Sequence, residues 1–423
     1  MPTGSGGHQA DWKAMDFINL SAFGFGGTAF STALGVVVLP VLVLAVVPEE
    51  MKNTYLGLLG LAGLGVAMAV QPLAGRMSDR TISPWGRRAP YLVVGSLLTC
   101  VAVFVLGVAS NFSVLALGLI LTQLCLNSAL GPYQALVRDL VPQLRRGAGS
   151  SFKIMADAGG GVVFLALVAF LLGPYSGPQN ARWLWISLAM LSVTLGASAA
   201  WTAVAVRHKE AHASGAGAVP SKGSPGQQTR VRFGQYLASR FCVFGALAVF
   251  QTYALFFLRD VVGLTNPAQA VGTISLAAGS SLLVAVYPFG RLSDLVGRRW
   301  VMVASALGGA GGVVALLLTN DLFPVILIST WLGACAGAFL GTSWAMATDL
   351  VSSGRTAEQM GIVNAAAVGG TALAKLAGPG VDLLNRLEGG LGYSTLLVAC
   401  AVLFVLGVFL LLPLPRKPAL GST

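Results

Sequence analysis

The sequence has little charge. Only 10% of its 423 residues are Asp, Glu, Lys or Arg, whereas an ordinary soluble domain carries about a quarter. Histidine and cysteine are also scarce: the three histidines lie in polar segments, and the five cysteines lie in apolar runs. An odd number of thiols in apolar surroundings favours buried cysteines over disulfides or metal ligands. No nucleophile, metal-ligand or phosphate-loop pattern stands out, so we do not expect an enzyme, a metal site or another cofactor.

Long apolar runs take the place of charge. Hydrophobic residues make up 55% of the chain, and the mean hydropathy is +0.78. About twelve runs reach the roughly 20 residues that cross a bilayer, and lipid requires such spans to be helical. The runs are Phe17 to Val47, Tyr55 to Arg76, Tyr91 to Ala109, Phe112 to Leu136, Ser151 to Leu172, Leu184 to Val206, Tyr236 to Leu258, Ala268 to Phe289, Val301 to Leu318, Leu322 to Ala347, Met360 to Leu384 and Thr395 to Leu412. The fold class predicted is an all-α membrane protein with 12 transmembrane helices.

Polar segments divide the chain into parts. We predict an N-terminal tail at 1–16, six helices within 17–206, a flexible linker at 207–232, six helices within 233–414 and a tail at 415–423. Most loop cations fall on one side of this topology, which places both termini and the linker in the cytoplasm. They are Arg80, Arg87, Arg88, Arg138, Arg145, Arg146, Arg207, Lys209, Lys222, Arg230, Arg232, Arg291, Arg298, Arg299, Arg355, Arg416 and Lys417. The net charge of +11 therefore reflects membrane orientation, and we expect no nucleic-acid partner.

One charged loop occurs twice. GRMSDRTISPWGRR at Gly75 to Arg88 returns as GRLSDLVGRR at Gly290 to Arg299, each time behind the second run of a set of six. GPYQALVRDLVP at Gly131 to Pro142 aligns with GTSWAMATDLVS at Gly341 to Ser352, about 210 residues later. Two aligned pairs indicate a duplication. The halves should be two pseudo-symmetric six-helix bundles in parallel orientation, since each has an even number of spans.

These motifs resemble the major facilitator superfamily of transporters over essentially the whole chain. The longer loop, SDRTISPWGRRAPY, is similar to that of the glycoside-pentoside-hexuronide and sucrose carrier branch, and GPYQALVRDLVP resembles the end of the fourth helix of sucrose carriers. The resemblance implies the major facilitator fold and movement of a small solute by alternating access.

The duplicated loops suggest a gate on the cytoplasmic side. Asp79 and Asp294 can cap a helix N-terminus of the other half, and the arginine pairs can reach Asp139 and Asp349. Anchoring of the arginines to anionic headgroups is the alternative. Gly75 and Gly290 are expected to allow close backbone approach. The predicted gate residues are Asp79, Arg80, Arg87, Arg88, Asp139, Asp294, Arg298, Arg299 and Asp349.

Polar residues inside the spans are the candidates for binding a solute, because they are costly in lipid. They lie on helices that line the central cavity of the superfamily: Gln123, Asn127, Gln251, Tyr253, Trp331, Asn364 and Lys375. Lys375 resembles a lysine of the melibiose-permease branch; snorkelling to the external face is its alternative role. The amides could instead form bonds between helices.

The residues that couple an ion in related carriers are missing. Gln123 stands where sucrose carriers have a carboxylate, the second run has no acid, and Phe25 and Gly26 lie near the place of the Lys-Asp pair of melibiose-type carriers. Glutamine exchanges no proton. Coupling to H⁺ or Na⁺ would then use Lys153 and Asp157, one turn apart in the fifth run; a structural ion pair or a uniporter are the alternatives.

Three functions remain open. The loop resemblance favours a secondary-active or facilitative transporter of a sugar or glycoside. The apolar cavity and absent acids favour a carrier of a lipid, pigment or drug-like amphipathic compound. A non-transporting assembly factor for a membrane complex is the third. We expect a monomer in a bacterial-type inner or plasma membrane, with lipid and a small solute as partners.

Overall fold

A computed structural model describes residues 13–141, 146–175, 177–212, 227–350 and 356–414. Every regular element in these ranges is a helix, and 12 helical segments are long and apolar enough to span a membrane. The all-α fold class with 12 spans is thereby confirmed. The first set comprises α1 (Ala14–Ala33), a π-helical segment (Leu34–Val38), α2 (Leu39–Val46), a 3₁₀ turn (Glu49–Met51), α3 (Lys52–Arg80), α4 (Ala89–Gly107), α5 (Phe112–Leu140), α6 (Arg146–Leu172), a 3₁₀ turn (Pro178–Asn180) and α7 (Arg182–His212). The second comprises α8 (Gln227–Asp260), α9 (Pro267–Val296), α10 (Arg298–Leu316), α11 (Leu322–Leu350), α12 (Thr356–Leu376), α13 (Gly378–Leu387) and α14 (Leu391–Leu411).

Several helices run beyond the apolar stretches that predict them. The sixth run was expected to end at Val206, but α7 continues to His212, and α8 begins at Gln227 rather than Tyr236. The polar residues at these ends, among them Lys, Glu and Gln, are good helix formers. The predicted linker 207–232 is thus helical at both ends, and its centre, 213–226, lies outside the described residues, as do the tails 1–12 and 415–423.

The eleventh run is interrupted. It forms α12 and α13, with the break at Ala377. Pro379 has no N–H to donate to the carbonyl of Lys375, so a continuous helix would leave that oxygen unpaired. The hydroxyl of Tyr253 on α8 donates to the carbonyls of Ala374 and Lys375, at 3.3 Å each. This side chain therefore stabilises the break where lipid could not.

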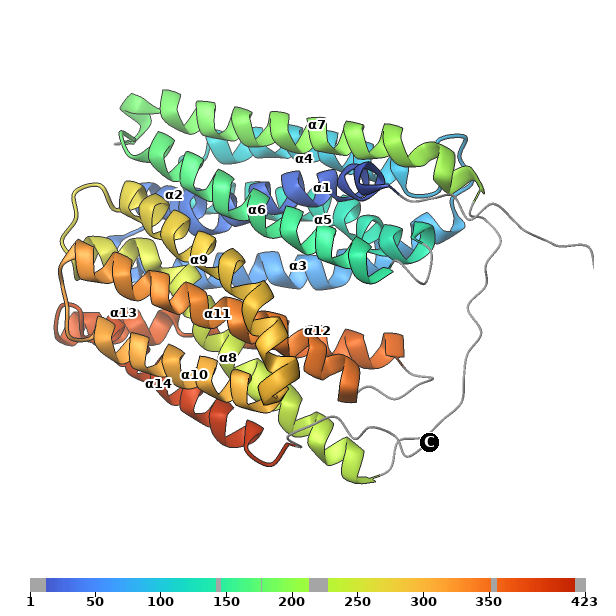
Figure 1. Cartoon of the computed structure of the whole chain (residues 1–423). Coiled ribbons are helices and arrows are strands. Elements are labelled where there is room, and N and C mark those ends of the chain that lie inside the picture. Colours follow the sequence, from blue (N-terminus) through green and yellow to red (C-terminus); the bar gives the residue numbers. More distant parts are fainter. Residues whose placement is uncertain (1–12, 142–145, 176, 213–226, 351–355, 415–423) are drawn as a thin grey trace, which may run out of the picture. The chain divides into compact units, whose positions relative to one another are not determined.

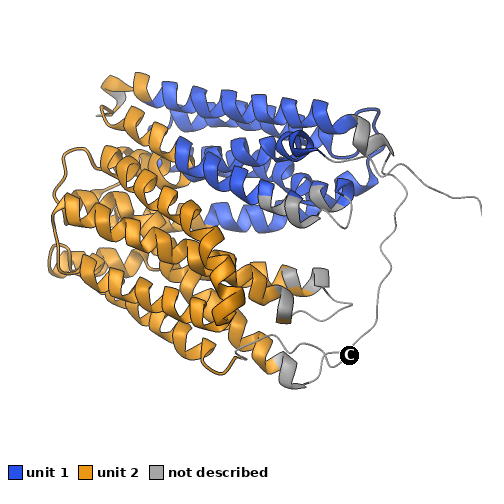
Figure 2. Ribbon diagram, viewed as in Figure 1, with its two compact units in different colours: residues 1–32, 62–164, 184–217 blue, residues 33–61, 165–183, 218–423 orange. Residues whose placement is uncertain are grey.

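The helices group into two compact units, coloured separately in Figure 2. Unit 1 comprises residues 1–32, 62–164 and 184–217, and unit 2 comprises 33–61, 165–183 and 218–423. Unit 2 therefore includes ends of first-half helices in addition to α8 to α14. The predicted domain limits follow the internal repeat of the sequence, whereas the two units are defined by their spatial compactness. The limits therefore stay a prediction.

Glycines bring helices into contact in both units. In unit 2, Gly333, Gly337 and Gly341 on α11 lie against the backbone of Ala278, Leu282 and Val286 on α9. In unit 1, Gly131 on α5 packs in the same way against the backbone of Gln71 on α3. Such small-residue faces allow close contact of membrane helices. Gly131 aligns with Gly341 in the sequence repeat, so the duplication extends to helix packing.

The glycine that precedes each arginine pair shapes the duplicated loop. Gly86 has φ 94° and Gly297 has φ 105°, a region that side chains with a β-carbon rarely adopt. A β-carbon added to Gly75 or Gly290, by contrast, would have no described atom within 4 Å. The expectation that these two allow close backbone approach is wrong. The positions that require glycine are Gly86 and Gly297, whose positive φ angles form the turn directly before the arginines.

Candidate functional site

Arg88 is the centre of an ion cluster in unit 1. Its side chain is buried, with Nη2 at 2.5 Å from Asp139 Oδ2 and 2.9 Å from Asp79 Oδ1. It also donates to the hydroxyl of Ser78 at 3.3 Å and to the carbonyl of Pro132 at 3.4 Å. Arg87 reaches the same Asp139 oxygen at 3.3 Å. The first loop is thus fastened to the ends of α3 and α5 by one planar guanidinium, a geometry that lysine cannot reproduce.

The second loop is held differently. In unit 2, Arg298 lies 3.6 Å from the carboxylate of Asp294 and donates to the carbonyl of Ala345. Arg299 donates to the carbonyl of Leu414 at 2.8 Å. The side chain of Asp349 is outside the described part, and Arg80 is exposed. A gate role requires contacts between the two halves, so for all nine residues it stays a prediction.

A buried acid that the sequence reading missed caps a helix in unit 2. Asp382 on α13 accepts the backbone N–H of Asn53 at 3.3 Å and that of Thr54 at 2.6 Å, in the first turn of α3. It also accepts the Asn53 amide at 2.8 Å and the Thr54 hydroxyl at 2.6 Å. An acid here satisfies unpaired helical N–H groups and the positive end of the helix dipole. This is the capping role that we predicted for Asp79 and Asp294.

Further polar contacts surround Asp382 at this end of unit 2. Tyr393 on α14 donates to Asp260 at 2.6 Å, and Lys52 pairs with the same carboxylate oxygen at 2.6 Å. Glu49 bridges Lys52 at 2.5 Å and Arg259 at 3.1 Å. We call Asp382 and these partners the Asp382 network; it comprises Glu49, Lys52, Asn53, Thr54, Arg259, Asp260, Asp382 and Tyr393. The network connects Glu49 and the first residues of α3, which belong to the first half of the sequence, with α8, α13 and α14 of the second half. The only sequence hint near it is Pro379, which marks a helix break close to Asp382 but does not indicate its partners.

The polar candidates of unit 1 form a ladder. Asn127 donates to Gln123 Oε1 at 2.9 Å, Gln71 donates to Asn127 Oδ1 at 2.7 Å, and Gln134 donates to Gln71 Oε1 at 3.2 Å. Gln71 and Gln134 were not predicted, although a glutamine within an apolar run is itself a signal. The amide nitrogen of Gln123 has no acceptor among the described residues. It is therefore available to a bound solute.

The candidates of unit 2 are more dispersed. Tyr253 is buried, and its hydroxyl is occupied at the α12–α13 break. Trp331 donates to the carbonyl of Gly308 on α10 at 2.9 Å and is otherwise exposed. Gln251 and Asn364 are exposed. Tyr253 and Trp331 thus contribute to helix packing, while Gln251 and Asn364 keep their amide groups on the surface of the unit.

Lys375 has no carboxylate partner in the described part of the chain. Its stem and ammonium lie against α3, where a β-carbon on Gly60 would be 2.7 Å from Nζ. Glycine at this position therefore makes room for the cation. An unpaired ammonium among apolar helices favours interaction with a polar or anionic group of a solute.

The two coupling candidates meet two residues that the sequence reading left out. Lys153 Nζ lies 2.6 Å from Asp157 Oδ2 and 5.0 Å from the ring centre of Tyr133. Asp157 Oδ1 and the Tyr133 hydroxyl are buried without hydrogen-bond partners among the described residues. Both of these oxygens crowd the position that a β-carbon on Gly24 of α1 would occupy. We call these four residues the Asp157 cluster.

Gly24→Ala tests this close packing. The added methyl would collide with two buried oxygens, and overpacking of this kind costs about 1–3 kcal/mol. We expect a lower melting temperature of the purified protein in detergent. Gly35→Ala is the matched control in the same predicted span, because no atom lies within 4 Å of its built β-carbon. Equal melting temperatures of the two variants would contradict the packing.

A buried arginine in α8 was also missed, although a charged residue inside an apolar run is a clear signal. Arg240 is 1% exposed and has no carboxylate partner among the described residues. Its guanidinium donates to the hydroxyls of Ser343 and Tyr236 and lies 4.5 Å and 4.8 Å from the ring centres of Phe244 and Trp344. The aromatic rings and hydroxyls thus take the place of a counter-ion.

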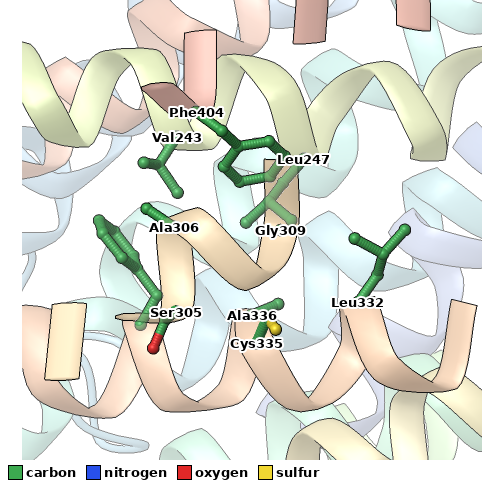
Figure 3. Close-up of a pocket in the computed structure, with 10 residues that line it drawn as sticks. Val243, Leu247, Ser305, Ala306, Gly309, Leu332, Cys335, Ala336 and Phe404 are labelled. Atoms are coloured by element: carbon green, nitrogen blue, oxygen red, sulfur yellow. The ribbon is translucent and has the colours of Figure 1, made fainter. Parts of the chain in front are cut away.

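Neither of two pockets in the single units suits a sugar. The first, between α8, α10, α11 and α14, is enclosed by apolar side chains such as Phe404, Leu332 and Val243 (Figure 3), and its volume of about 10 Å³ holds one water at most. The second, of about 510 Å³, lies between α1, α6 and α7 and is lined chiefly by apolar residues, including Phe25, Met155 and Trp201. Neither pocket is lined by a residue of the amide ladder or by Lys375.

Solved structures with the same fold are membrane transporters. A bacterial homologue of the human lysosomal transporter Spinster superposes with a TM-score of 0.71 at 14% identity, covering 94% of this chain and 96% of that one. A peptide transporter of the POT family in complex with alafosfalin gives 0.70 at 13% identity, covering 96% of each chain. At such low identity the likeness shows the fold alone, which is that of the major facilitator transporters.

The family model for "MFS/sugar transport protein" matches residues 21–381. The chain therefore belongs to this family and is an integral membrane protein. It is similar to sucrose transport protein SUT1 of rice, at 30% identity over 189 residues, or 39% of this chain and 33% of that protein. Sucrose transport protein SUC3 of Arabidopsis thaliana is 27% identical over 124 residues, or 24% and 21% of the two chains. The matches span a third or less of these relatives.

Proposed function

We propose that the chain is a transporter of a sugar or glycoside, secondary-active or facilitative, that works by alternating access. Its family and its sucrose-carrier relatives support this function over the carriage of an amphipathic compound or assembly of a membrane complex. The glycine faces between α9 and α11 and between α3 and α5 suit helices that change their mutual position during transport.

The observation that carries the proposal is the amide ladder of unit 1. A sugar hydroxyl both donates and accepts, and each buried hydroxyl needs a partner. Gln123 Nε2 is a free donor whose position is fixed, because its own Oε1 is held by Asn127 at 2.9 Å. Lys375 in unit 2 adds three donors without a competing carboxylate. Each of these groups, within its own unit, can donate to an oxygen of such a solute.

Counterflow into proteoliposomes tests the proposal. Vesicles with purified protein, loaded with unlabelled sucrose, should take up external labelled sucrose faster than protein-free vesicles. Gln123→Leu should lower the initial rate about fivefold, since one hydrogen bond to the solute contributes roughly 1 kcal/mol. Asn127 keeps a partner in this variant, because its amide also donates to the backbone carbonyl of residue 123 at 2.7 Å.

Ser128→Ala is the matched control on α5. Its hydroxyl bonds the carbonyl of Leu124 in its own helix at 2.7 Å, so its removal should leave the rate unchanged. If sucrose gives no counterflow, a panel of mono- and disaccharides follows. The absence of counterflow with every sugar in the panel would overturn the function.

We further propose that the protein acts as a monomer in the plasma membrane with both termini in the cytoplasm. The one-sided distribution of loop arginines supports the orientation. Labelling of single cysteines introduced in the 213–226 segment with a membrane-impermeant maleimide should occur in inside-out vesicles and fail in intact cells.

A further inference from the structure

Asp157 has one carboxylate oxygen that is paired with a cation and one that has no hydrogen-bond partner among the described residues. Oδ2 is paired with Lys153 at 2.6 Å, whereas Oδ1 is buried without a partner. An ionised carboxylate only accepts hydrogen bonds, so a buried oxygen without a donor is unfavourable for the charged form. A protonated Oδ1 becomes a donor, and the Tyr133 hydroxyl, which likewise has no partner among the described residues, crowds the same point above Gly24. The pair with Lys153 thus suits the ionised form of Asp157, and the unpaired Oδ1 suits the protonated form.

The cluster is absent from the second half. Gly160 packs on the backbone of Phe25, and Gly370 packs in the same way on the backbone of Phe241. These equivalent contacts align the first helix of one half with the first helix of the other, and likewise the two fifth helices. In this register Gly24 aligns with Arg240, Tyr133 with Ser343 and Asp157 with Ala367. The first half thus has Asp157 facing Gly24, whereas the second half has the buried Arg240 facing the hydroxyl of Ser343. Asp157 is therefore not part of the framework that is duplicated in the two halves.

Few charged groups influence this acid. Within the described part of unit 1, Lys153 on its own helix and Tyr133 on α5 are the titratable groups that face Asp157, and α1 presents Gly24. The side chains of Lys153 and Asp157 are 22% and 26% exposed, whereas Oδ1 is buried and faces Gly24 of α1. Movement of α1 against α6 would uncover Oδ1, and the glycines Gly159 to Gly161 of α6 lie one turn away.

We propose that Asp157 is the proton-coupling site of this transporter, with Lys153 and Tyr133 as positioning residues; this rests on the proposed transport function. A proton from water on one side of the membrane binds to Oδ1 and forms the neutral carboxyl group. After the conformational change the O–H bond breaks, and the proton leaves to water on the other side. H⁺, rather than Na⁺, fits a site with a single carboxylate that already carries a fixed cation at 2.6 Å.

The first test detects the proton itself and needs no solute. Infrared difference spectra of the purified protein between about pH 8 and pH 5 report new carboxyl C=O groups, and most exposed carboxylates stay ionised across this range. We expect a band from one carboxyl in the wild type and its loss in Asp157→Asn. Asp321→Asn, which changes an exposed acid at the start of α11, should keep the band. Identical bands in the wild type and Asp157→Asn would overturn the proposal.

The second test separates coupling from transport. Asp157→Asn should keep sucrose counterflow within about twofold of the wild type, because exchange moves no net proton. Accumulation driven by an alkaline vesicle interior should fall at least about tenfold. Wild-type accumulation in this variant would also overturn the proposal. If no sugar moves in any variant, the sugar function fails, and the infrared band alone decides whether Asp157 binds a proton.

Discussion

Replacing Asp382 by alanine is expected to lower the free energy of unfolding by about 3 kcal/mol, one of the two largest effects predicted for this chain. The carboxylate accepts two backbone N–H groups of α3 and the side chains of Asn53 and Thr54. Each buried donor left without a partner costs about 1–3 kcal/mol. Unfolding of the purified protein in detergent, followed by tryptophan fluorescence, measures the change.

Two further variants show whether the effect comes from the Asp382 network. Asp382→Asn keeps one acceptor oxygen and should lose about half as much stability. Asp321→Asn, an exposed loop acid, should stay within about 0.5 kcal/mol of the wild type. The cap is refuted if Asp382→Ala unfolds at the same denaturant concentration as Asp321→Asn.

Arg88→Gln is expected to be comparably damaging, at about 3 kcal/mol, because the half-buried Asp139 loses its closest cation and the buried arginine site loses its guanidinium. Asp79 would lose its contact at 2.9 Å, and Asp139 would keep only Arg87 at 3.3 Å. The same unfolding measurement applies. Arg88→Lys keeps the charge but cannot bridge both carboxylates, so it should recover only part of the loss.

Arg80→Gln is the matched control for Arg88. It lies in the same charged stretch and is exposed, so its removal should change stability by about 0.5 kcal/mol at most. Similar losses for the two variants would mean that the cluster contributes through the net charge of the loop. A large difference assigns the effect to burial of Arg88.

The spans and the duplication could be predicted because their signals are local. A run of apolar residues of bilayer length must be helical wherever it lies, and GRMSDRTISPWGRR and GRLSDLVGRR can be compared without a structure. The contacts of Arg88 with Asp139 were expected from the same motifs, and the structure brings the two together at 2.5 Å. The glycines were assigned less well: the strained turn is at Gly86 and Gly297, not at Gly75 and Gly290.

The Asp382 network could not be predicted, because its members are charged or polar residues at the ends of separate helices. Asn53 and Asp382 are 329 positions apart, and nothing in either stretch specifies the other. The role of Gly24 could not be predicted either, because glycines are frequent in the apolar runs. Its neighbours Asp157 and Tyr133 show that its missing side chain leaves the space that two buried oxygens fill.

By itself, the sequence determined that the chain is helical, crosses the membrane with 12 spans, contains two related halves and carries the loops of a carrier family, because hydrophobic length and repeated motifs act locally. The tertiary structure decided which polar groups face one another. It placed an acid on the first turn of α3, a free amide on a ladder of α3 and α5, and a half-satisfied carboxyl against a glycine of α1. Those positions depend on helix packing, in which a single added methyl or a broken helix changes the partners of a buried group.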